Sequence, residues 1–309
     1  MSAPNGVLAI VGATATGKST LAVEVALRLG GEVISADAFT AYRGIDAGTA
    51  KPTLEERRGV PHHLIDLKEP TEPFSAGEFA RLARASAREI LSRGRLPILC
   101  GGTGFYVRAF FEGLFVGPPR DERLREALRL VEARRGAPWL VHLLSILDPA
   151  SGARIAPRDG ARAIRYLEIA LSTGRRPSDL FRERPGERWD GPSVKVLLTL
   201  PRPALYGRIE RRFRESIMAP LTGEVKRLLE AGVPVSAPGM AAIGYRETAA
   251  LLEGRMQTGE WADTVVRETR RYAKRQETWF RSEPELHLLR ADAPGLVDEV
   301  VAASRPLFS

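Results

Sequence analysis

The sequence predicts an α/β protein in which a parallel sheet is flanked by helices and an all-helical domain is inserted. Three observations lead to this prediction. Short apolar runs alternate with helical patterns in the first third of the chain, a helical and arginine-rich stretch follows at about 118–181, and a strand pattern returns at 194–200. Strands that alternate with helices are typical of parallel sheets.

The elements follow one another in a regular order. Residues 7–11 form a short apolar run, 12–17 a glycine-bounded turn, and 19–29 a helical pattern that Gly30 and Gly31 end. Further strands are expected at 32–35, 63–66, 96–100 and 194–200, and further helices at 79–91, 202–229 and 261–281. The expected domains are an α/β core formed by 1–117 and 190–309, and a helical insertion at 118–189.

Composition places the chain among ordinary globular proteins. Its 309 residues suffice for about two domains, and the hydrophobic (44%) and charged (27%) fractions exclude a disordered or fibrous chain. Lys and Arg total 46 against 38 Asp and Glu, so the net charge is +8. This surplus indicates a polyanionic partner or an anionic substrate if the charges gather on one surface, and only aids solubility if they are scattered.

Cysteine and histidine are too few for a disulfide framework or a zinc module. Cys100 is the only cysteine, and His62 and His63 are adjacent, unlike the i, i+4 pair of a helical zinc site. A single thiol fits a reducing compartment, so we expect a cytoplasmic protein. The N-terminal apolar run follows no basic segment and is too short for a membrane span, so neither secretion nor a membrane role is expected.

The strongest local signal is a complete G-x-x-x-x-G-K-[ST] motif between a strand and a helix. It consists of Gly12, Ala13, Thr14, Ala15, Thr16, Gly17, Lys18 and Ser19. Backbone N–H groups of such a loop and the positive end of the next helix together hold a diphosphate. Lys18 is expected to neutralise phosphate oxygens, and the Ser19 hydroxyl to bind a bridging Mg²⁺. The expected fold is therefore P-loop NTPase-like, and the flanking elements argue against a chance glycine turn.

The loop leaves open which molecule carries the diphosphate. ATP is the usual partner, which makes nucleotide binding one interpretation. Any diphosphate ester presents the same oxygens, so other residues must discriminate.

Further motifs follow along the chain in a fixed order. They are 34–44 (ISADAFTAYRG), 46–52 (DAGTAKP), 60–66 (VPHHLID), 101–106 (GGTGFY), 242–247 (AIGYRE) and 269–281 (TRRYAKRQETWFR). Together with the loop at 12–19, they resemble the tRNA dimethylallyltransferase family, also called tRNA isopentenyltransferase. The resemblance covers nearly the whole chain and is highly specific.

The resemblance implies a reaction and its partners. A dimethylallyl group would pass from dimethylallyl diphosphate to N6 of the adenosine 3′-adjacent to the anticodon, position 37 of the tRNA, in the presence of Mg²⁺. The loop at 12–19 would then hold the diphosphate of the prenyl donor. The anticodon stem-loop of tRNA would bind to the helical insertion and to the C-terminal helices, and we expect a monomer.

Asp37 is the expected general base. The exocyclic amine of adenine is a poor nucleophile, so removal of a proton as N6 attacks should accelerate transfer by ~10²- to 10⁴-fold. Asp37 follows the second strand, at the edge of the sheet where open α/β sheets bind ligands. A ligand of Mg²⁺-bound water or a helix cap is the alternative.

The residues after Asp37 depart from the family's pattern. That pattern has serine, a variable residue and glutamine, whereas this chain has Ala38, Phe39 and Thr40. Replacing a long amide by a short hydroxyl reduces the hydrogen-bonding reach toward a nucleobase. Recognition near the target adenosine is therefore expected to differ.

Three further residues match functional positions of the family. Thr103 would line the channel in which the donor and the flipped adenosine meet, or cap the next helix, or do both. Arg208, which lies on one helix face with Arg212, would stabilise the charge on the leaving diphosphate, with an exposed basic face as the alternative. Arg125 would touch tRNA, although on its own it reads as a solvated helical arginine.

A tRNA substrate also needs a basic surface. Arginines recur at three- and four-residue intervals at 154–165 and again at 267–281, which suits contact with a phosphate backbone, although charged runs are usually solvated faces. Trp279 and Phe280 are expected to pack the last helix against its neighbour, with base stacking as the alternative. The expected tRNA-contacting residues are Asp37, Ala38, Phe39, Thr40, Thr103, Arg125, Ala161, Arg162, Ala163, Ile164, Arg165, Ala242, Ile243, Gly244, Tyr245, Arg246, Glu247, Lys274, Arg275, Gln276, Trp279 and Arg281.

Other functional classes are weaker. Prenyl transfer to a free adenine nucleotide, as in the adenylate isopentenyltransferases, leaves the two basic stretches without a role. A P-loop small-molecule kinase would require ATP turnover. A non-catalytic RNA-binding module would leave Lys18, Ser19 and Asp37 unexplained.

Overall fold

The structure is a computed structural model that describes residues 2–115, 117–183 and 186–308. The chain divides into two compact units. One is formed by Met1–Phe111 and Trp189–Ser309, and the other by Glu112–Arg188. The smaller unit therefore begins at the last residue of the helix that follows the fourth strand, earlier than the insertion at 118–189 that the sequence predicts.

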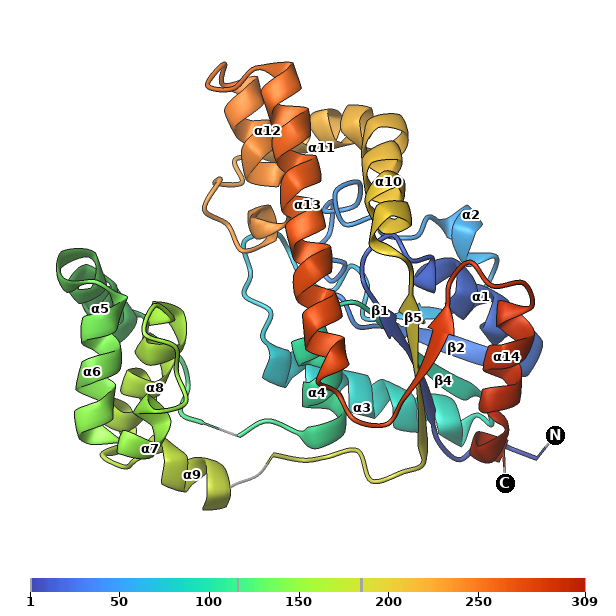
Figure 1. Cartoon of the computed structure of the whole chain (residues 1–309), viewed down its shortest axis with the longest axis horizontal. Helices are drawn as coiled ribbons and strands as arrows, with labels where there is room; N and C mark the ends of the chain where they lie inside the picture. The colour runs from blue at the N-terminus through green and yellow to red at the C-terminus, as the bar shows by residue number, and fades with distance from the viewer. Residues whose placement is uncertain (1, 116, 184–185, 309) are drawn as a thin grey trace. The chain divides into compact units, whose positions relative to one another are not determined.

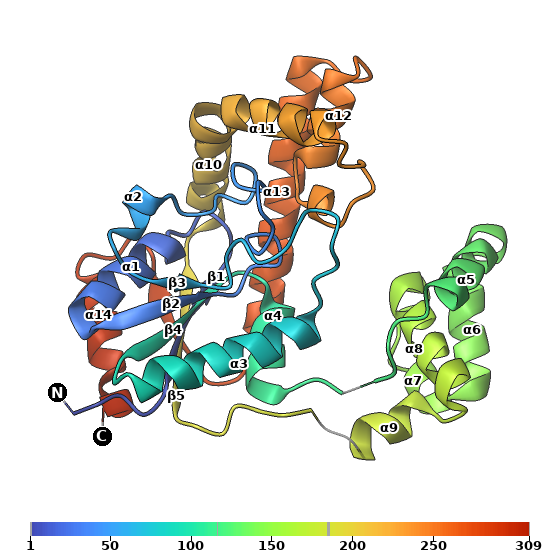
Figure 2. The same cartoon turned by 180° about the vertical axis from the view of Figure 1, so that it is seen from behind.

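The described part of the larger unit contains a six-stranded parallel sheet with the order β3-β2-β4-β1-β5-β6. Figures 1 and 2 show its strands from opposite sides. The strands are β1 (Val7–Gly12), β2 (Gly31–Ser35), β3 (His62–His63), β4 (Leu96–Gly101), β5 (Ser193–Thr199) and β6 (Leu286–Arg290). The arrangement confirms the predicted α/β class, and β5 shows that the chain re-enters the sheet after the insertion.

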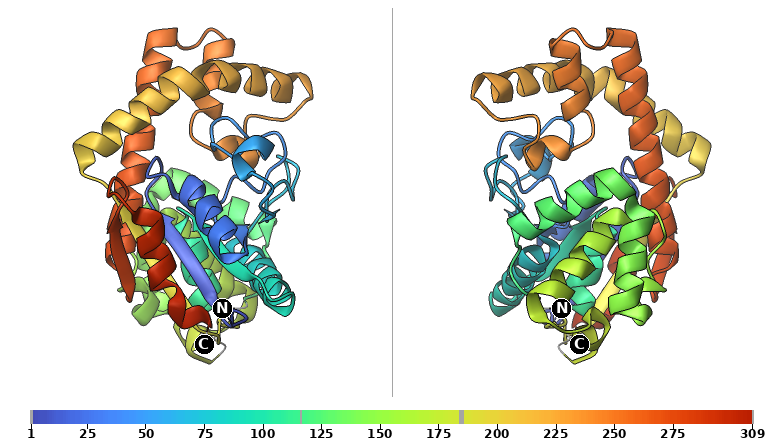
Figure 3. Two further views of the ribbon diagram at one scale, coloured as in Figure 1. Left: turned by 90° about the vertical axis from the view of Figure 1, so that its right-hand side faces the viewer. Right: turned by 90° about the vertical axis from the view of Figure 1, so that its left-hand side faces the viewer.

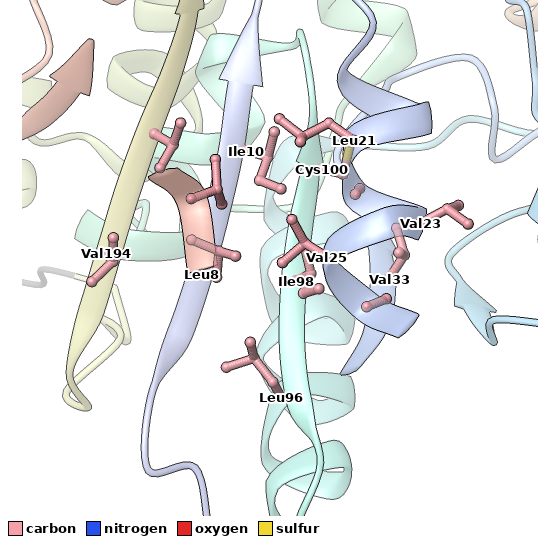
Figure 4. Close-up of a cluster of buried hydrophobic side chains, with 14 of the residues drawn as sticks. Leu8, Ile10, Leu21, Val23, Val25, Val33, Leu96, Ile98, Cys100 and Val194 are labelled. Atoms are coloured by element: carbon pink, nitrogen blue, oxygen red, sulfur yellow. The ribbon is translucent and has the colours of Figure 1, made fainter. Parts of the chain in front are cut away.

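The sheet is built around β1 and β4, in which every residue is buried. Strands covered on both faces read as continuous apolar runs, which is why both were visible in the sequence. Figure 4 shows side chains of β1 and β4, such as Leu8 and Ile98, beside Leu21 and Val25 of α1 (Lys18–Leu29). Helix α14 (Leu296–Ala303) adds Val300 to the same cluster.

Helix α3 (Ala76–Ser92) packs against β2 and β4 outside this cluster. Its N-terminus is capped by Ser75, which accepts a hydrogen bond from the N–H of Glu78. The guanidinium of Arg84, buried on the same helix, donates to the carbonyls of Ala109 and Phe110. These are among the last carbonyls of α4 (Gly104–Glu112), so Arg84 supplies partners that this helix end lacks.

The third strand is shorter than predicted. Residues 63–66 were expected to be extended, but β3 ends at His63 because Leu64 (φ 61°) and Asp66 (φ 55°) adopt left-handed backbone conformations. Left-handed residues cannot continue a ladder. The side chain of Asp66 instead meets Lys51, with Nζ–Oδ1 at 2.5 Å.

A group of helices stands at the carboxyl end of the sheet (Figures 1 and 3). The helix predicted at 202–229 is interrupted by a π-helical turn at Phe213–Ile217, which separates α10 (Arg202–Arg212) from α11 (Met218–Glu230). Helix α13 (Thr258–Arg281) starts before the predicted residue 261, and α12 (Tyr245–Leu252) was not predicted as a helix. Trp261, Tyr245 and Phe213 are central to the apolar cluster that joins them.

The smaller unit is helical. Its helices are α5 (Glu122–Arg135), α6 (Ala137–Leu147), α7 (Pro149–Gly152), α8 (Gly160–Thr173) and α9 (Pro177–Glu183). Leu128, Leu140, Leu144 and Leu167 form its core, so this unit has an apolar cluster of its own. Over the residues described in either unit, no helix has both the length and the apolar character needed to cross a bilayer.

Candidate active site

A cavity of about 700 Å³ opens at the carboxyl ends of β1, β2 and β4. Its walls come from the loop after β1, the loop after β2, the turn after β4, and helices α10 and α13. Lining residues from these elements include Lys18, Asp37, Gly102, Arg208 and Gln276. The carboxyl edge of the sheet is where open α/β folds bind ligands, and the tertiary structure brings together here residues from both ends of the chain.

The loop at Gly12–Ser19 has the conformation of a phosphate cradle. Gly12 and Gly17 have φ values of 150° and 92°, which side chains rarely adopt, and a Cβ on Gly12 would lie 2.6 Å from the Leu198 carbonyl oxygen. The Lys18 Nζ donates to the Ala13 carbonyl at 2.7 Å. Helix α1 starts at Lys18 with no side chain of the described residues capping it, so its first N–H groups face the loop.

The electrostatics of the site centre on Lys18 and Asp37. Burial lowers the pKa of Lys18 to about 8, although the Cys100 thiol and the Asp37 carboxylate favour its charged form. Burial also raises the pKa of Asp37, against the hydrogen bond from the Phe39 N–H and the positive charge of Lys18. Each charge therefore stabilises the other inside a partly dehydrated cavity.

The loop that bears Asp37 is fixed by short-range hydrogen bonds. The Phe39 N–H donates to Asp37 Oδ1 at 2.9 Å, and the Ala38 N–H donates to Thr103 Oγ1 at 3.1 Å. The Thr40 hydroxyl is buried and hydrogen-bonded to that of Ser35 at 2.8 Å. Thr40, which stands where the family has glutamine, thus uses its hydroxyl within the protein.

The turn after β4 approaches the Asp37 loop closely. A Cβ on Gly101 would lie 2.1 Å from the carbonyl oxygen of Ala36, so this position has no room for a side chain. The Thr103 N–H also donates to that carbonyl, at 3.2 Å. Glycine at 101 therefore allows Thr103 to reach the residue after Asp37.

Three arginines of α10 line the cavity: Arg208, Arg211 and Arg212. The sequence placed Arg208 and Arg212 on one helix face. Burial lowers the pKa of Arg212, and the charge of Arg212 lowers the pKa of Lys18. Only Arg208 was predicted as a site residue, yet the i, i+4 spacing to Arg212 was already visible in the sequence.

Helix α13 contributes Tyr272 and Gln276 to the cavity. The Gln276 Nε2 donates to the Gly102 carbonyl at 2.8 Å, and its Oε1 accepts from the Thr14 N–H at 2.8 Å. Burial, and to a lesser extent the Asp37 carboxylate, raise the pKa of the Tyr272 hydroxyl to about 12. Sequence reasoning did not single out Tyr272. Its four-residue separation from Gln276 places both residues on one face of the helix, but only the tertiary structure shows that this face lines the cavity.

The predicted tRNA-contacting segment 242–247 is mostly internal. Ala242 and Ile243 line the cavity, and Ala242 and Tyr245 are buried members of the apolar cluster. The Tyr245 hydroxyl donates to the buried carboxylate of Glu224, which also accepts the N–H groups of Asp46 and Ala47 at 2.9 and 3.0 Å.

Other members of that segment have local roles or are exposed. Glu247 accepts the N–H of Gly244, whose left-handed φ of 98° starts α12, and Arg246 is exposed. Among the residues of this segment, Arg246 is the one whose side chain is freely available to a ligand.

The predicted contacts in the smaller unit divide in the same way. Ala161 and Arg162 are exposed, but Ala163 and Ile164 pack in the unit's own core and offer no side-chain surface. The guanidinium groups of Arg125 and Arg165 both bind Glu168. Arg125 is therefore not the solvated arginine that its sequence context indicated.

The C-terminal part of α13 carries exposed Lys274, Arg275 and Arg281. Trp279 packs edge-on against Phe105 and beneath the guanidinium of Arg108, and Phe280 is buried, which confirms that both rings pack the helix. Within the described residues, no cluster of three or more His, Cys, Asp or Glu side chains that could hold a metal is found. A metal at the site would thus depend on few protein ligands.

The sequence was compared with families and individual proteins. The model of the family described as IPP transferase matches residues 40–283, and that described as isopentenyl transferase matches residues 5–72. The tRNA dimethylallyltransferase of Thermomicrobium roseum is 45% identical over 298 residues, covering 95% of this chain and 89% of the relative. That of Koribacter versatilis is 42% identical over 294 residues, covering 94% and 95%.

Solved structures show the same likeness. The tRNA isopentenylpyrophosphate transferase of Bacillus halodurans superposes with a TM-score of 0.72 at 40% identity, over 98% of this chain and 96% of the other. A eukaryotic dimethylallyltransferase acting on tRNA gives a TM-score of 0.77 at 26% identity, over 93% and 74%. The family match, the relatives and the cavity that joins a P-loop to a half-buried aspartate agree: this chain belongs to the tRNA dimethylallyltransferase family.

Proposed function

We propose that this protein is a prenyltransferase that moves a dimethylallyl group from dimethylallyl diphosphate to N6 of the adenosine 3′-adjacent to the anticodon of tRNA. The observation that carries the proposal is the presence of the P-loop Lys18 and the half-buried Asp37 in one cavity. A positively charged loop can bind the leaving diphosphate, and a carboxylate beside it can accept the proton. Membership in the family supplies the nature of the prenyl donor and of the tRNA acceptor.

The donor's diphosphate would lie in the loop of Gly12–Ser19. Lys18, Arg208 and Arg212 bring three positive charges to the same cavity, so charge that develops on the leaving group meets cations already in place. The Ser19 hydroxyl is exposed at the start of α1 and would bind a Mg²⁺. This ion usually keeps several waters and takes few protein ligands, so the residues present fit it, and it would neutralise diphosphate charge.

The transfer itself forms one bond and breaks another. N6 of adenine attacks C1 of the dimethylallyl group, the C1–O bond to the diphosphate breaks, and the N6 proton passes to the Asp37 carboxylate. The Phe39 N–H donates to Asp37 Oδ1, so Oδ2 would be the oxygen that takes the proton. Thr103 holds the loop of this base through the Ala38 N–H.

The acceptor would be an anticodon stem-loop whose target base is turned out of its stack. Exposed Lys274, Arg275 and Arg281 on α13, and exposed Arg162 on α8, would contact the RNA backbone. In this proposal the helical unit is a second tRNA-binding surface, and one copy of the chain acts on one tRNA.

One experiment tests the proposal directly. The protein is incubated with unmodified tRNA and Mg²⁺, together with dimethylallyl diphosphate or ATP, and the digested tRNA is examined by mass spectrometry. We expect a five-carbon addition to an adenosine with the prenyl donor only. Addition to free AMP with no addition to tRNA would favour the adenylate-prenylating class, and ATP hydrolysis without addition would favour a kinase.

A further inference from the structure

We propose that Tyr272 and Gln276 of α13 are positioning residues that hold three separate segments of the active site in register. These segments are the P-loop, the turn after β4 and the loop that bears Asp37. The inference deepens the proposed function and rests on it. It concerns how the diphosphate site and the proton acceptor are kept at a fixed separation.

Gln276 joins the P-loop to the turn after β4. Its side chain is 5% exposed, and both ends of its amide are bonded to backbone: Oε1 to the Thr14 N–H and Nε2 to the Gly102 carbonyl, each at 2.8 Å. A Cβ on Gly102 would lie 2.2 Å from Nε2, so glycine at this position is what admits the amide. The Thr14 N–H belongs to the phosphate cradle, and Gln276 therefore fixes the path of that cradle.

Tyr272 extends the connection to the Asp37 loop. Its side chain lines the cavity and interacts with the side chains of Thr103 and Gln276. Thr103 Oγ1 in turn accepts the N–H of Ala38, the residue directly after Asp37. Tyr272 lies one helical turn before Gln276, so the same helix, α13, contacts all three segments.

These contacts matter because the reaction depends on distance. The carbon that is attacked belongs to a donor held by the P-loop, while the acceptor of the proton belongs to the loop after β2. Catalytic groups displaced by a fraction of an ångström to 1 Å lose much of their effect. A rigid helix that bonds to both loops restrains that distance, and Tyr272 and Gln276 need not touch the reacting atoms to do so.

The first test addresses Gln276 without relying on prenyl transfer. The affinity for inorganic pyrophosphate in Mg²⁺ is measured by calorimetry for wild type, Gln276→Met and Thr278→Ala, which is a control on the exposed side of the same helix. We expect about tenfold weaker binding for Gln276→Met and no change for Thr278→Ala. Wild-type affinity in Gln276→Met would overturn the role of Gln276.

The second test is a double-mutant cycle on the catalytic rate. The kcat of prenyl transfer is measured for Tyr272→Phe, Thr103→Val and the double variant, with Tyr166→Phe in the helical unit as a matched control. Each single variant is expected to lower kcat about fivefold to tenfold with pyrophosphate affinity unchanged within twofold, and Thr103→Ser to restore it. Because Tyr272→Phe and Thr103→Val disrupt the same contact, the kcat of the double variant should be little lower than that of the more impaired single variant.

The outcomes separate this inference from the proposed function. Losses that multiply in the double variant, or an unchanged kcat in Tyr272→Phe, would overturn the positioning role of Tyr272. A wild-type protein that binds pyrophosphate but adds no prenyl group to tRNA would overturn the proposed function. In that case the pyrophosphate affinities would still decide the role of Gln276.

Discussion

Arg125 and Glu168 form a two-point ion pair inside the helical unit, with Nε–Oε1 and Nη2–Oε2 both at 2.9 Å. The Arg125 side chain is 12% exposed, and that of Glu168 is 0% exposed. Glu168 also binds Arg165 and accepts the Asp121 N–H, which joins α8 to the start of α5. Arg125 therefore serves the fold of this unit.

Removal of Arg125 should cost stability. Arg125→Ala leaves the Glu168 carboxylate buried with fewer partners, and we expect a loss of about 3 kcal/mol in the free energy of unfolding of the helical unit. Arg129→Ala, which removes an exposed pair with Glu126, should change it by less than about 0.5 kcal/mol. Urea unfolding followed by circular dichroism measures both. A weaker tRNA affinity with unchanged stability would instead support a contact role for Arg125.

The same carboxylate should make the helical unit sensitive to acid. Burial alone would raise the pKa of Glu168, but the hydrogen bonds from Arg125, Arg165 and the Asp121 N–H prevail and hold it at about 2, below the ordinary 4.5. A lowered pKa gives stability that is complete above about pH 4.5 and is lost as the pH falls toward 2, in total about 3 kcal/mol. Thermal unfolding of wild type and Glu168→Gln should therefore converge as the pH falls. Parallel curves would contradict this.

Asp37→Asn should abolish catalysis while leaving binding in place. Asparagine keeps the size of the side chain and can still accept the Phe39 N–H, but its amide cannot take up the N6 proton. We expect prenyl transfer to slow by ~10²- to 10⁴-fold, with the affinities for tRNA and pyrophosphate within a few-fold of wild type. Single-turnover assays and filter binding measure these quantities. Transfer at the wild-type rate would exclude Asp37 as the base.

The pH dependence of kcat should show a displaced acid limb. Burial raises the pKa of Asp37, against the Phe39 N–H and the charge of Lys18. Because the base must be ionised, kcat should fall as the pH drops through this raised pKa, at a higher pH than an exposed aspartate would give. Rates measured from about pH 4 to pH 8 under donor and tRNA saturation test this. A rate that is constant down to about pH 4 would refute it.

The exposed cations of α13 should bind RNA through its backbone. Lys274→Gln removes one such charge, so tRNA affinity should fall and the slope of log affinity against log salt should decrease by about 1. Arg28→Gln is the control, because Arg28 lies in the last turn of α1, at the helix end opposite the P-loop, and pairs with Asp298. Filter binding over a salt series measures both slopes. Equal slopes for Lys274→Gln and wild type would place the RNA elsewhere.

Parts of the fold that depend on local pattern could be predicted from the sequence. The strands β1 and β4 are buried on both faces, and the motif at Gly12–Ser19 joins a strand to a helix, with positive φ values at Gly12, Ala15 and Gly17. Elements at the edge were harder to predict. Strand β3 ends after two residues, and β6 mixes half-buried and exposed positions without regular alternation, which gives a weak signal.

Burial within the contact segments was a second point that the sequence could not decide. Arg125, Ala163 and Ile164 lie in motifs or stripes that indicate RNA contact, yet the fold of the helical unit turns their side chains inward. Residues that recur at three- and four-residue intervals share one face of a helix. The packing of neighbouring helices decides whether that face is exposed to solvent.

By itself, the sequence determined the class of the sheet, the glycine-bounded loop with Lys18 and Ser19, and the aspartate that follows the second strand, because each depends on residues close together in the chain. Only the tertiary structure decided which distant groups complete the site. Gln276 meets Thr14 across 262 residues, and Arg212 enters the cavity from α10. Such contacts depend on how parallel strands and the helices beyond them pack in space, and no local periodicity encodes that packing.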